Sequence, residues 1–289
     1  MALPTIAVIN FVPALNDNDV REAIHAVNRQ VLEHFTPIWG YGRTLDLFIP
    51  NFEPTDPNTL AEEFIPADSV MYLVDEATLP GALGFHDLNT RDVPYGFVFV
   101  LDPNDWTTTL SHETLELVLD PTANVLVPGP DPRDENNTVL HSYEACDAVE
   151  RLSYPIGDIL VSDFVTPSYF TVGEAAGARN DFLGVGVPSF GVTRGSHIAF
   201  FDLSTGQEAT VVGAEMPARR SLARRAKLHD HPKPTRPAEE TLEEQLKSYQ
   251  GGKQRPGCSG LKHLRGITRT ARYREATGRL GTMLAAVRG

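Results

Sequence analysis

The chain has 289 residues, 41% of them hydrophobic and 22% charged, so it can bury a sizeable core as one large domain or two. No apolar run is long enough to span a bilayer, and the N-terminus lacks the basic and apolar regions of a signal peptide. These features predict a protein without a membrane-spanning segment, cytoplasmic by default. Cys146 and Cys258 are too few and too far apart to form a disulfide framework.

The charge is divided unevenly along the chain. Residues 1–213 contain 8 basic side chains, all arginine, against 31 acidic ones, which gives a formal charge of −23. Residues 214–289 contain 17 basic and 7 acidic side chains, which gives +10. This asymmetry predicts an acidic folded body at 1–213 and a basic C-terminal extension at 214–289 that is partly disordered or held by a partner.

The basic extension has two favoured partners. It could fold back on the acidic body, or it could dock on a larger assembly such as a viral particle. Specific nucleic-acid recognition is disfavoured because the only aromatic residues in the extension are Tyr249 and Tyr273.

The first half of the body predicts an α+β fold, with strands, one long helix and a loop before the central helix. Apolar runs, or alternation of apolar and polar residues, predict the strands. Apolar residues at helical spacing predict the helix, with Asn16 as its N-cap. The expected strands are residues 5–12, 44–49, 69–75, 83–88 and 96–101, the helix is 16–35, and the loop is 51–66.

Residues 106–120 predict the helix that is central to function. The helix is largely apolar and should be buried, yet His112, Glu113, Glu116 and Asp120 fall on one stripe. Three carboxylates buried together repel one another unless a cation compensates. We therefore expect this stripe to bind a metal ion.

The rest of the body gives a less regular pattern. We expect a loop at residues 124–138, a helix at 141–152, a hairpin at 154–164, and short strands or loops at 182–212.

The central helix contains the sequence HETLE, a variant of the HExxH zinc motif. His112 and Glu116 stand at i and i+4 and can share a cation, while Glu113 can act as a general base. A glutamate in place of the second histidine weakens Lewis acidity or favours a harder metal, so we expect Zn²⁺ or another divalent cation. The alternative is that these side chains face solvent or hydrogen-bond to each other.

The third ligand is expected from the segment HSYEACDAVE. On a helix, Glu144, Asp147 and Glu150 would share one face, and Glu144 is the preferred ligand, with His141 as another candidate. Cys146 is either a thiol ligand or a small buried hydrophobic residue. The alternative for the whole segment is an acidic surface helix.

The helix LSHETLELVLDP, preceded by strands and followed by an acidic segment, resembles the zincin metallopeptidases, particularly the gluzincin branch. The segments GFHDL, VPYGFVFV, YEACDAVE and ILVSDFVTPSYF are also similar to an uncharacterised bacterial and phage family. The resemblance covers roughly residues 5–170.

The resemblance implies a zincin-like mixed sheet and a set of residue roles. His112, Glu116 and Glu144 would be metal ligands, Glu113 would be the base, and Asp147 would orient His112. The strand at residues 96–101 would form the sheet edge, where a peptide substrate could add as a strand.

Together, these features predict a metal-dependent hydrolase, most specifically a zincin-like peptidase acting on a peptide or protein. The competing prediction is a non-enzymatic structural or virion-associated protein whose metal site is vestigial or holds a structural ion.

Overall fold

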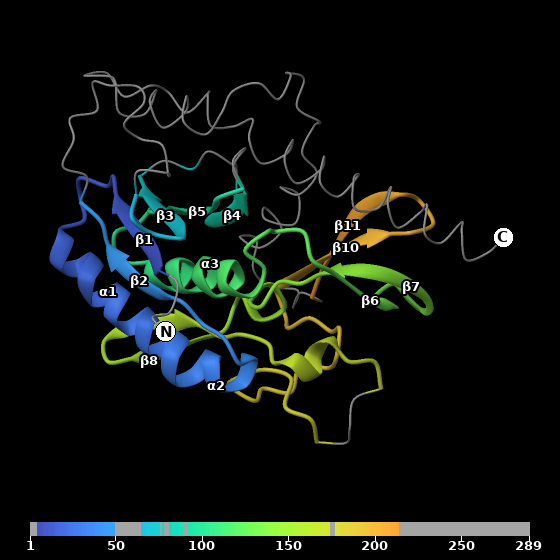
Figure 1. Cartoon of the computed structure of the whole chain (residues 1–289). Coiled ribbons are helices and arrows are strands. Elements are labelled where there is room, and N and C mark those ends of the chain that lie inside the picture. Colours follow the sequence, from blue (N-terminus) through green and yellow to red (C-terminus); the bar gives the residue numbers. More distant parts are fainter. Residues whose placement is uncertain are drawn as a thin grey trace.

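The structure of the chain is a computed structural model (Figure 1). It describes residues 5–49, 65–75, 77, 81–88, 92–173 and 177–213. The predicted loop at 51–66 lies almost wholly outside the described residues, and the predicted basic extension at 214–289 lies entirely outside them. Among the described residues, no helix has both the length and the apolar character needed to cross a membrane.

The described residues form an α+β protein, which confirms the predicted class. Its larger sheet has the strand order β2-β1-β3-β5-β4, in which β4 alone runs antiparallel to its neighbour. These strands are β1 (Thr5–Asn10), β2 (Thr44–Leu47), β3 (Ser69–Val74), β4 (Gly84–Leu88) and β5 (Pro94–Phe99).

Alternate residues of the sheet enter two separate cores. On β3, Met71 and Leu73 pack against the helices, while Val70, Tyr72 and Val74 pack on the opposite face. Because both faces are covered, the central strands read as continuous apolar runs rather than alternating ones.

The first helical segment follows the predicted pattern and is continuous from α1 (Asp17–Arg29) through a π-helical turn at Gln30–Phe35 into α2 (Thr36–Trp39). The Asn16 side chain caps its start by accepting hydrogen bonds from two backbone amides. Gly40 ends it in the left-handed conformation, with φ of 84°.

Helix α3 (Thr107–Leu119) confirms the predicted central helix within one residue at each end. It packs against β4, β5 and the later strand β9, and it shares a core with α1 on one side of the sheet (Figure 1). Asp120 follows it, and its carboxylate accepts hydrogen bonds from the backbone N–H groups of Thr122 and Val125. These bonds satisfy Asp120 locally, so it fixes the loop after the helix.

The second half forms an antiparallel sheet of order β11-β10-β7-β6 and a separate hairpin β8-β9. The strands are β6 (Leu126–Asp131), β7 (Asp134–Ser142), β8 (Ser153–Ile156), β9 (Ile159–Ser162), β10 (His197–Asp202) and β11 (Gln207–Val212). Two short 3₁₀ turns, Asp147–Val149 and Pro167–Phe170, lie in the connections. The predicted hairpin at 154–164 and the short strands within 182–212 are confirmed.

Three sequence predictions are wrong. Residues 124–138 are mostly strand rather than loop. The prolines Pro128 and Pro130 lie on β6, and an edge strand of this kind tolerates residues that have no N–H donor. Residues 141–152 are not a helix, because β7 continues to Ser142 and only a 3₁₀ turn follows. The strand predicted at 96–101 is β5, which lies inside the sheet, because β4 pairs outside it and forms the edge.

Candidate metal centre

Helix α3 directs two of the predicted site residues, His112 and Glu116, toward the loop that follows β7, and a third, Glu113, toward β4. Glu113 and Glu116 are buried, and His112 is mostly buried. The Nε2 atom of His112 lies 3.2 Å from the Oε2 atom of Glu116, as the i, i+4 spacing predicts. The imidazole and the carboxylate therefore meet on one face of the helix.

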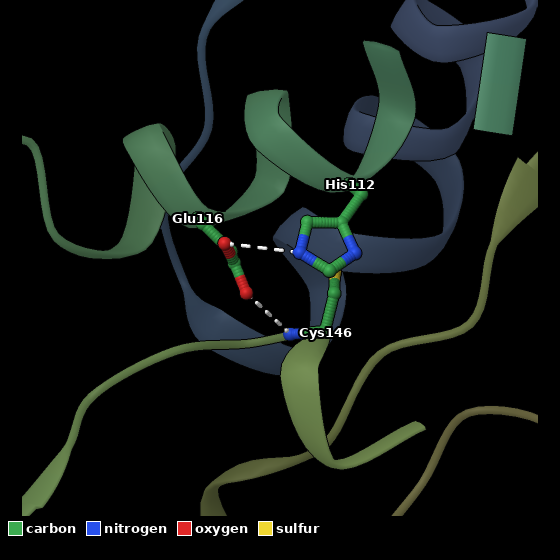
Figure 2. Close-up of side chains that lie close together, drawn as sticks. All are labelled: His112, Glu116 and Cys146. Atoms are coloured by element: carbon green, nitrogen blue, oxygen red, sulfur yellow. Dashed lines mark hydrogen bonds and ion pairs between the residues drawn. The ribbon is translucent and has the colours of Figure 1, made fainter. Parts of the chain in front are cut away.

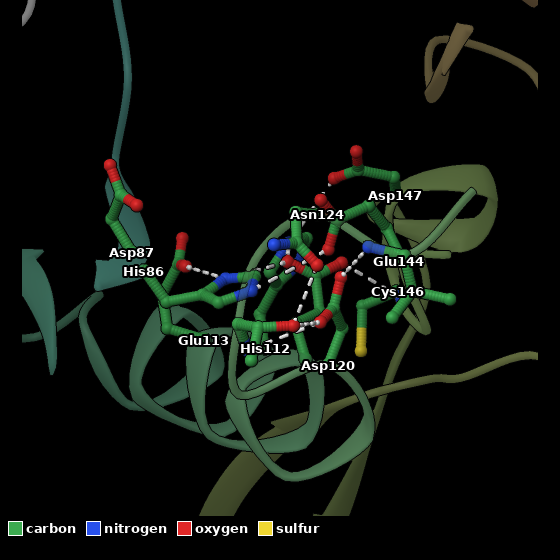
Figure 3. Close-up of polar contacts among 12 residues, drawn as sticks. His86, Asp87, His112, Glu113, Asp120, Asn124, Glu144, Cys146 and Asp147 are labelled. Carbon is green, nitrogen blue, oxygen red and sulfur yellow. Dashed lines mark hydrogen bonds and ion pairs between the residues drawn. The ribbon is translucent and has the colours of Figure 1, made fainter. Parts of the chain in front are cut away.

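His86, on the edge strand β4, enters the same cluster and was not predicted (Figure 3). Its Nδ1 atom lies 3.7 Å from Glu113 Oε2 and 3.9 Å from Glu116 Oε2. Its Nε2 atom lies 3.8 Å from Glu144 Oε2 and has no hydrogen-bond partner within the described part of the chain. A buried imidazole with three carboxylates around it is a strong candidate for a metal ligand.

The segment between β7 and the 3₁₀ turn supplies the other side of the cluster. The backbone N–H of Cys146 donates a hydrogen bond of 3.1 Å to Glu116 Oε1. Asp147 Oδ1 lies 3.4 Å from His112 Nε2, so Asp147 contacts His112 at the nitrogen that also faces Glu116. Residues that are far apart in the sequence thus contact one another in this cluster.

An outer chain of ion pairs continues from Asp147. Its Oδ2 atom lies 3.2 Å from Nε2 of His197, and Nδ1 of His197 lies 2.9 Å from Oε2 of Glu150. Burial lowers the pKa of His197, but the two carboxylates outweigh it and raise that pKa to about 10. Strand β10 is therefore tied electrostatically to the cluster.

The pKa values of the two inner histidines, His86 and His112, are also shifted. Burial lowers the pKa of His86, but the carboxylates of Glu144, Glu113 and Glu116 outweigh this effect and raise it to about 9. For His112, Glu116 and Asp147 likewise overcome burial and raise the pKa well above its usual range. The carboxylates of the cluster thus favour a positive charge at this position, which either a proton on an imidazole or a bound cation can supply.

Among the described residues, three groups of side chains have ligand atoms that all lie within 4.8 Å of one another, and each is geometrically able to hold a metal ion. They are His112–Glu116–Cys146, His86–Glu116–Glu144 and Asp147–Glu150–His197. Figure 2 shows the first of these, in which the Glu116 carboxylate faces the imidazole of His112 and accepts a hydrogen bond from the backbone N–H of Cys146.

The predicted ligands are divided between two of the groups. Glu116 lies with His112 in one and with Glu144 in another, but no group among the described residues contains both His112 and Glu144. His141, the alternative ligand, belongs to none of these groups, and its Nε2 atom lies 2.8 Å from the carbonyl oxygen of Pro130.

Sequence reasoning missed His86 because its role depends on tertiary structure. His86 pairs with Gly96 in the antiparallel register of β4 and β5, and this register brings it over α3. GFHDL was recognised only as part of a resemblance, and no spacing within it indicates a ligand.

A small pocket opens beside the cluster. Carboxylate, aromatic and aliphatic side chains line it: His141, Ser142, Glu144, Asp147, Ala148, Tyr169, Phe170, Ile198 and Ala199. Glu144 and Asp147 are the two members of the cluster that reach this pocket.

Comparison of the chain with protein-family models and with curated proteins gave no match.

Proposed function

We propose that the protein is a metal-dependent hydrolase that cleaves amide bonds in peptides or proteins. The observation that supports it best is the convergence of His86, Glu116 and Glu144, with Glu113 within 3.7 Å of His86. This set offers the nitrogen and oxygen ligands of a hydrolytic metal centre, and Glu113, whose Oε2 atom faces the Nδ1 atom of His86, is a further carboxylate close to the cluster.

The chemistry of the donors fits a divalent cation. One imidazole and two carboxylates suit zinc, and the second carboxylate also favours harder cations. The Nε2 atom of His86 is buried and has no hydrogen-bond partner among the described residues, an arrangement that costs free energy unless a ligand binds there. In this proposal His86 takes the ligand position that the sequence motif gave to His112.

Glu113 is the proposed general base. A bound divalent cation supplies Lewis acidity, which acidifies water and polarises a carbonyl group. Glu113 accepts the proton from the attacking water at its carboxylate and then passes it to the leaving amine. Its carboxylate is held against β4 because Gly84 has no side chain, and a Cβ there would lie 2.7 Å from Glu113 Oε1.

The peptidase assignment rests on the resemblance to zincins. Two features support it: the HETLE helix packs under a mixed sheet, and an antiparallel strand, β4, forms the edge beside the site. An edge strand has backbone groups that can pair with an extended peptide. A peptide added there would lie beside His86.

The test combines metal content with turnover. Purified full-length protein should hold a stoichiometric divalent metal and cleave members of a mixed peptide library. Glu113→Gln should retain the metal and lose cleavage by about 10²-fold or more, the usual contribution of a general base. Glu22→Gln, a change of the same kind at an exposed position on α1, is the matched control. Unchanged cleavage in Glu113→Gln would refute the assignment.

A structural ion is the second candidate function. The specific observation in its favour is that His86, Glu116 and Glu144 are all buried, whereas catalytic ions need access to substrate. In that case Glu144→Ala would lose the metal and lower the melting temperature, and the wild-type protein would cleave no peptide in the library.

A further inference from the structure

Glu116 belongs to two groups of ligands and lies between them. Its Oε2 atom faces His86 at 3.9 Å and His112 at 3.2 Å. If His86, Glu116 and Glu144 hold the cation of the proposed hydrolase, then His112 and Cys146 are two further potential ligands near Glu116 that this cation does not use. They provide one nitrogen and one sulfur ligand.

We propose a second cation site, of the zinc class, formed by His112 Nε2, the Glu116 carboxylate and the Cys146 thiolate. This inference rests on the proposed function, because that proposal assigns the neighbouring cation. Glu116 would bridge the two cations, as carboxylates do in two-metal sites where the ions lie roughly 3.5–4 Å apart.

The distance between His112 and Glu116 agrees with this geometry. Zinc bonds of 2.0–2.3 Å at tetrahedral angles place neighbouring ligand atoms roughly 3.3–3.6 Å apart. His112 Nε2 and Glu116 Oε2 are 3.2 Å apart, and all three ligand atoms lie within 4.8 Å of one another (Figure 2). Asp147 Oδ1, 3.4 Å from the same nitrogen, offers a fourth ligand.

Glu116 has enough acceptor capacity to bridge. A carboxylate has two oxygens and about four lone-pair sites. The Cys146 N–H uses one of these sites on Oε1. The remaining sites on the two oxygens are enough for one cation on each side.

The two sites differ in ligand chemistry. The His112 site includes sulfur, and a soft thiolate selects zinc over magnesium, calcium or manganese. Binding replaces the proton of the Cys146 thiol with the cation and releases that proton to solvent, so no oxidant or reductant is needed. Zinc should therefore fill both sites, whereas a hard cation should fill only the His86 site.

The third group, Asp147–Glu150–His197, is not proposed as a site. Both ring nitrogens of His197 already face carboxylates at 3.2 and 2.9 Å, which satisfies the imidazole without an ion. In this arrangement, His197 holds Asp147 beside His112.

The experiment measures metal stoichiometry and thiolate coordination in the full chain. Zinc-loaded wild-type protein should hold about two equivalents. Cobalt-loaded protein should show a thiolate-to-cobalt charge-transfer band in the near ultraviolet. Cys146→Ser should lower zinc to about one equivalent and abolish the band, while Cys258→Ser, the matched control at the other cysteine, should change neither.

The outcomes separate this inference from the proposed function. The wild-type cobalt spectrum needs no variant, so it stays decisive even if Cys146→Ser fails to fold. One zinc equivalent that is lost in Glu144→Ala, together with no thiolate band, would overturn the second site alone. Absence of bound metal from the wild-type protein would overturn both.

Discussion

Asp163, next to the β8-β9 hairpin, should make the free energy of unfolding depend on pH. The substitution Asp163→Asn should remove this contribution. Asp163 is fully buried, and its Oδ1 atom accepts a hydrogen bond of 3.1 Å from the backbone N–H of Leu183. Its Oδ2 atom has no hydrogen-bond partner among the residues described. Burial raises the pKa of Asp163 from 3.8 to about 6.

The magnitude and sign follow from this shift. One pKa unit corresponds to 1.36 kcal/mol, so the rise corresponds to about 3 kcal/mol. The folded state binds this proton more tightly than the unfolded state. The contribution to stability is therefore fully present below pH 3.8 and is lost as the pH rises through 6. Asp163→Asn cannot ionise and lacks this dependence.

Urea unfolding at pH 4 and pH 7 tests the prediction. The free energy of unfolding of Asp163→Asn, relative to wild type, should increase by about 2 kcal/mol between the two pH values, because part of the effect is already lost at pH 4. The cost of burying the new amide is the same at both pH values and cancels. Asp158→Asn, the same change in the exposed turn of the hairpin, is the control. Parallel pH profiles for wild type and Asp163→Asn would refute the reasoning.

Three other substitutions test the packing around the site. Gly84→Ala should displace the Glu113 carboxylate and lower the free energy of unfolding by about 1–3 kcal/mol, measured by urea unfolding alongside metal content. Ser111→Ala should cost about 1–3 kcal/mol, because its buried hydroxyl donates a 2.6 Å hydrogen bond to the side chain of Gln30; Ser111→Thr, which keeps the hydroxyl, should recover part of the loss. Leu110→Ala, at a fully buried position of α3, should cost about 2–5 kcal/mol; a loss below 1 kcal/mol would contradict the assigned core.

The parts of the fold that were predicted correctly are those set by local patterns. The apolar runs of β1 and β3 and the helical spacing of α1 and α3 each determine their own secondary structure. The proline-rich strand β6 was missed because turn-forming residues predict a loop when edge pairing is unknown. Pairing depends on a partner elsewhere in the chain, which a local pattern does not contain.

The candidate site divides in the same way. His112 and Glu116 were found together because one helical turn fixes their separation. His86 was missed because its position depends on β4 pairing outside β5, a choice of sheet edge that the sequence does not indicate. Glu144 lies close to Glu116, but the helix that was expected to bring it there does not exist.

That missing helix also explains why the donors form separate groups. On a helix, Glu144, Asp147 and Glu150 would share one face and point toward one place. In the irregular segment and short 3₁₀ turn that occur instead, Glu144 meets His86, Asp147 meets His112, and Glu150 meets His197.

The same irregular course brings Cys146, two residues after Glu144, to the His112 side of Glu116. Each of the two ligand groups that share Glu116 thus takes one ligand from this segment. In the arrangement that we propose, two cations share this carboxylate, in place of the single cation held by His112, Glu116 and Glu144 that the sequence motif predicted.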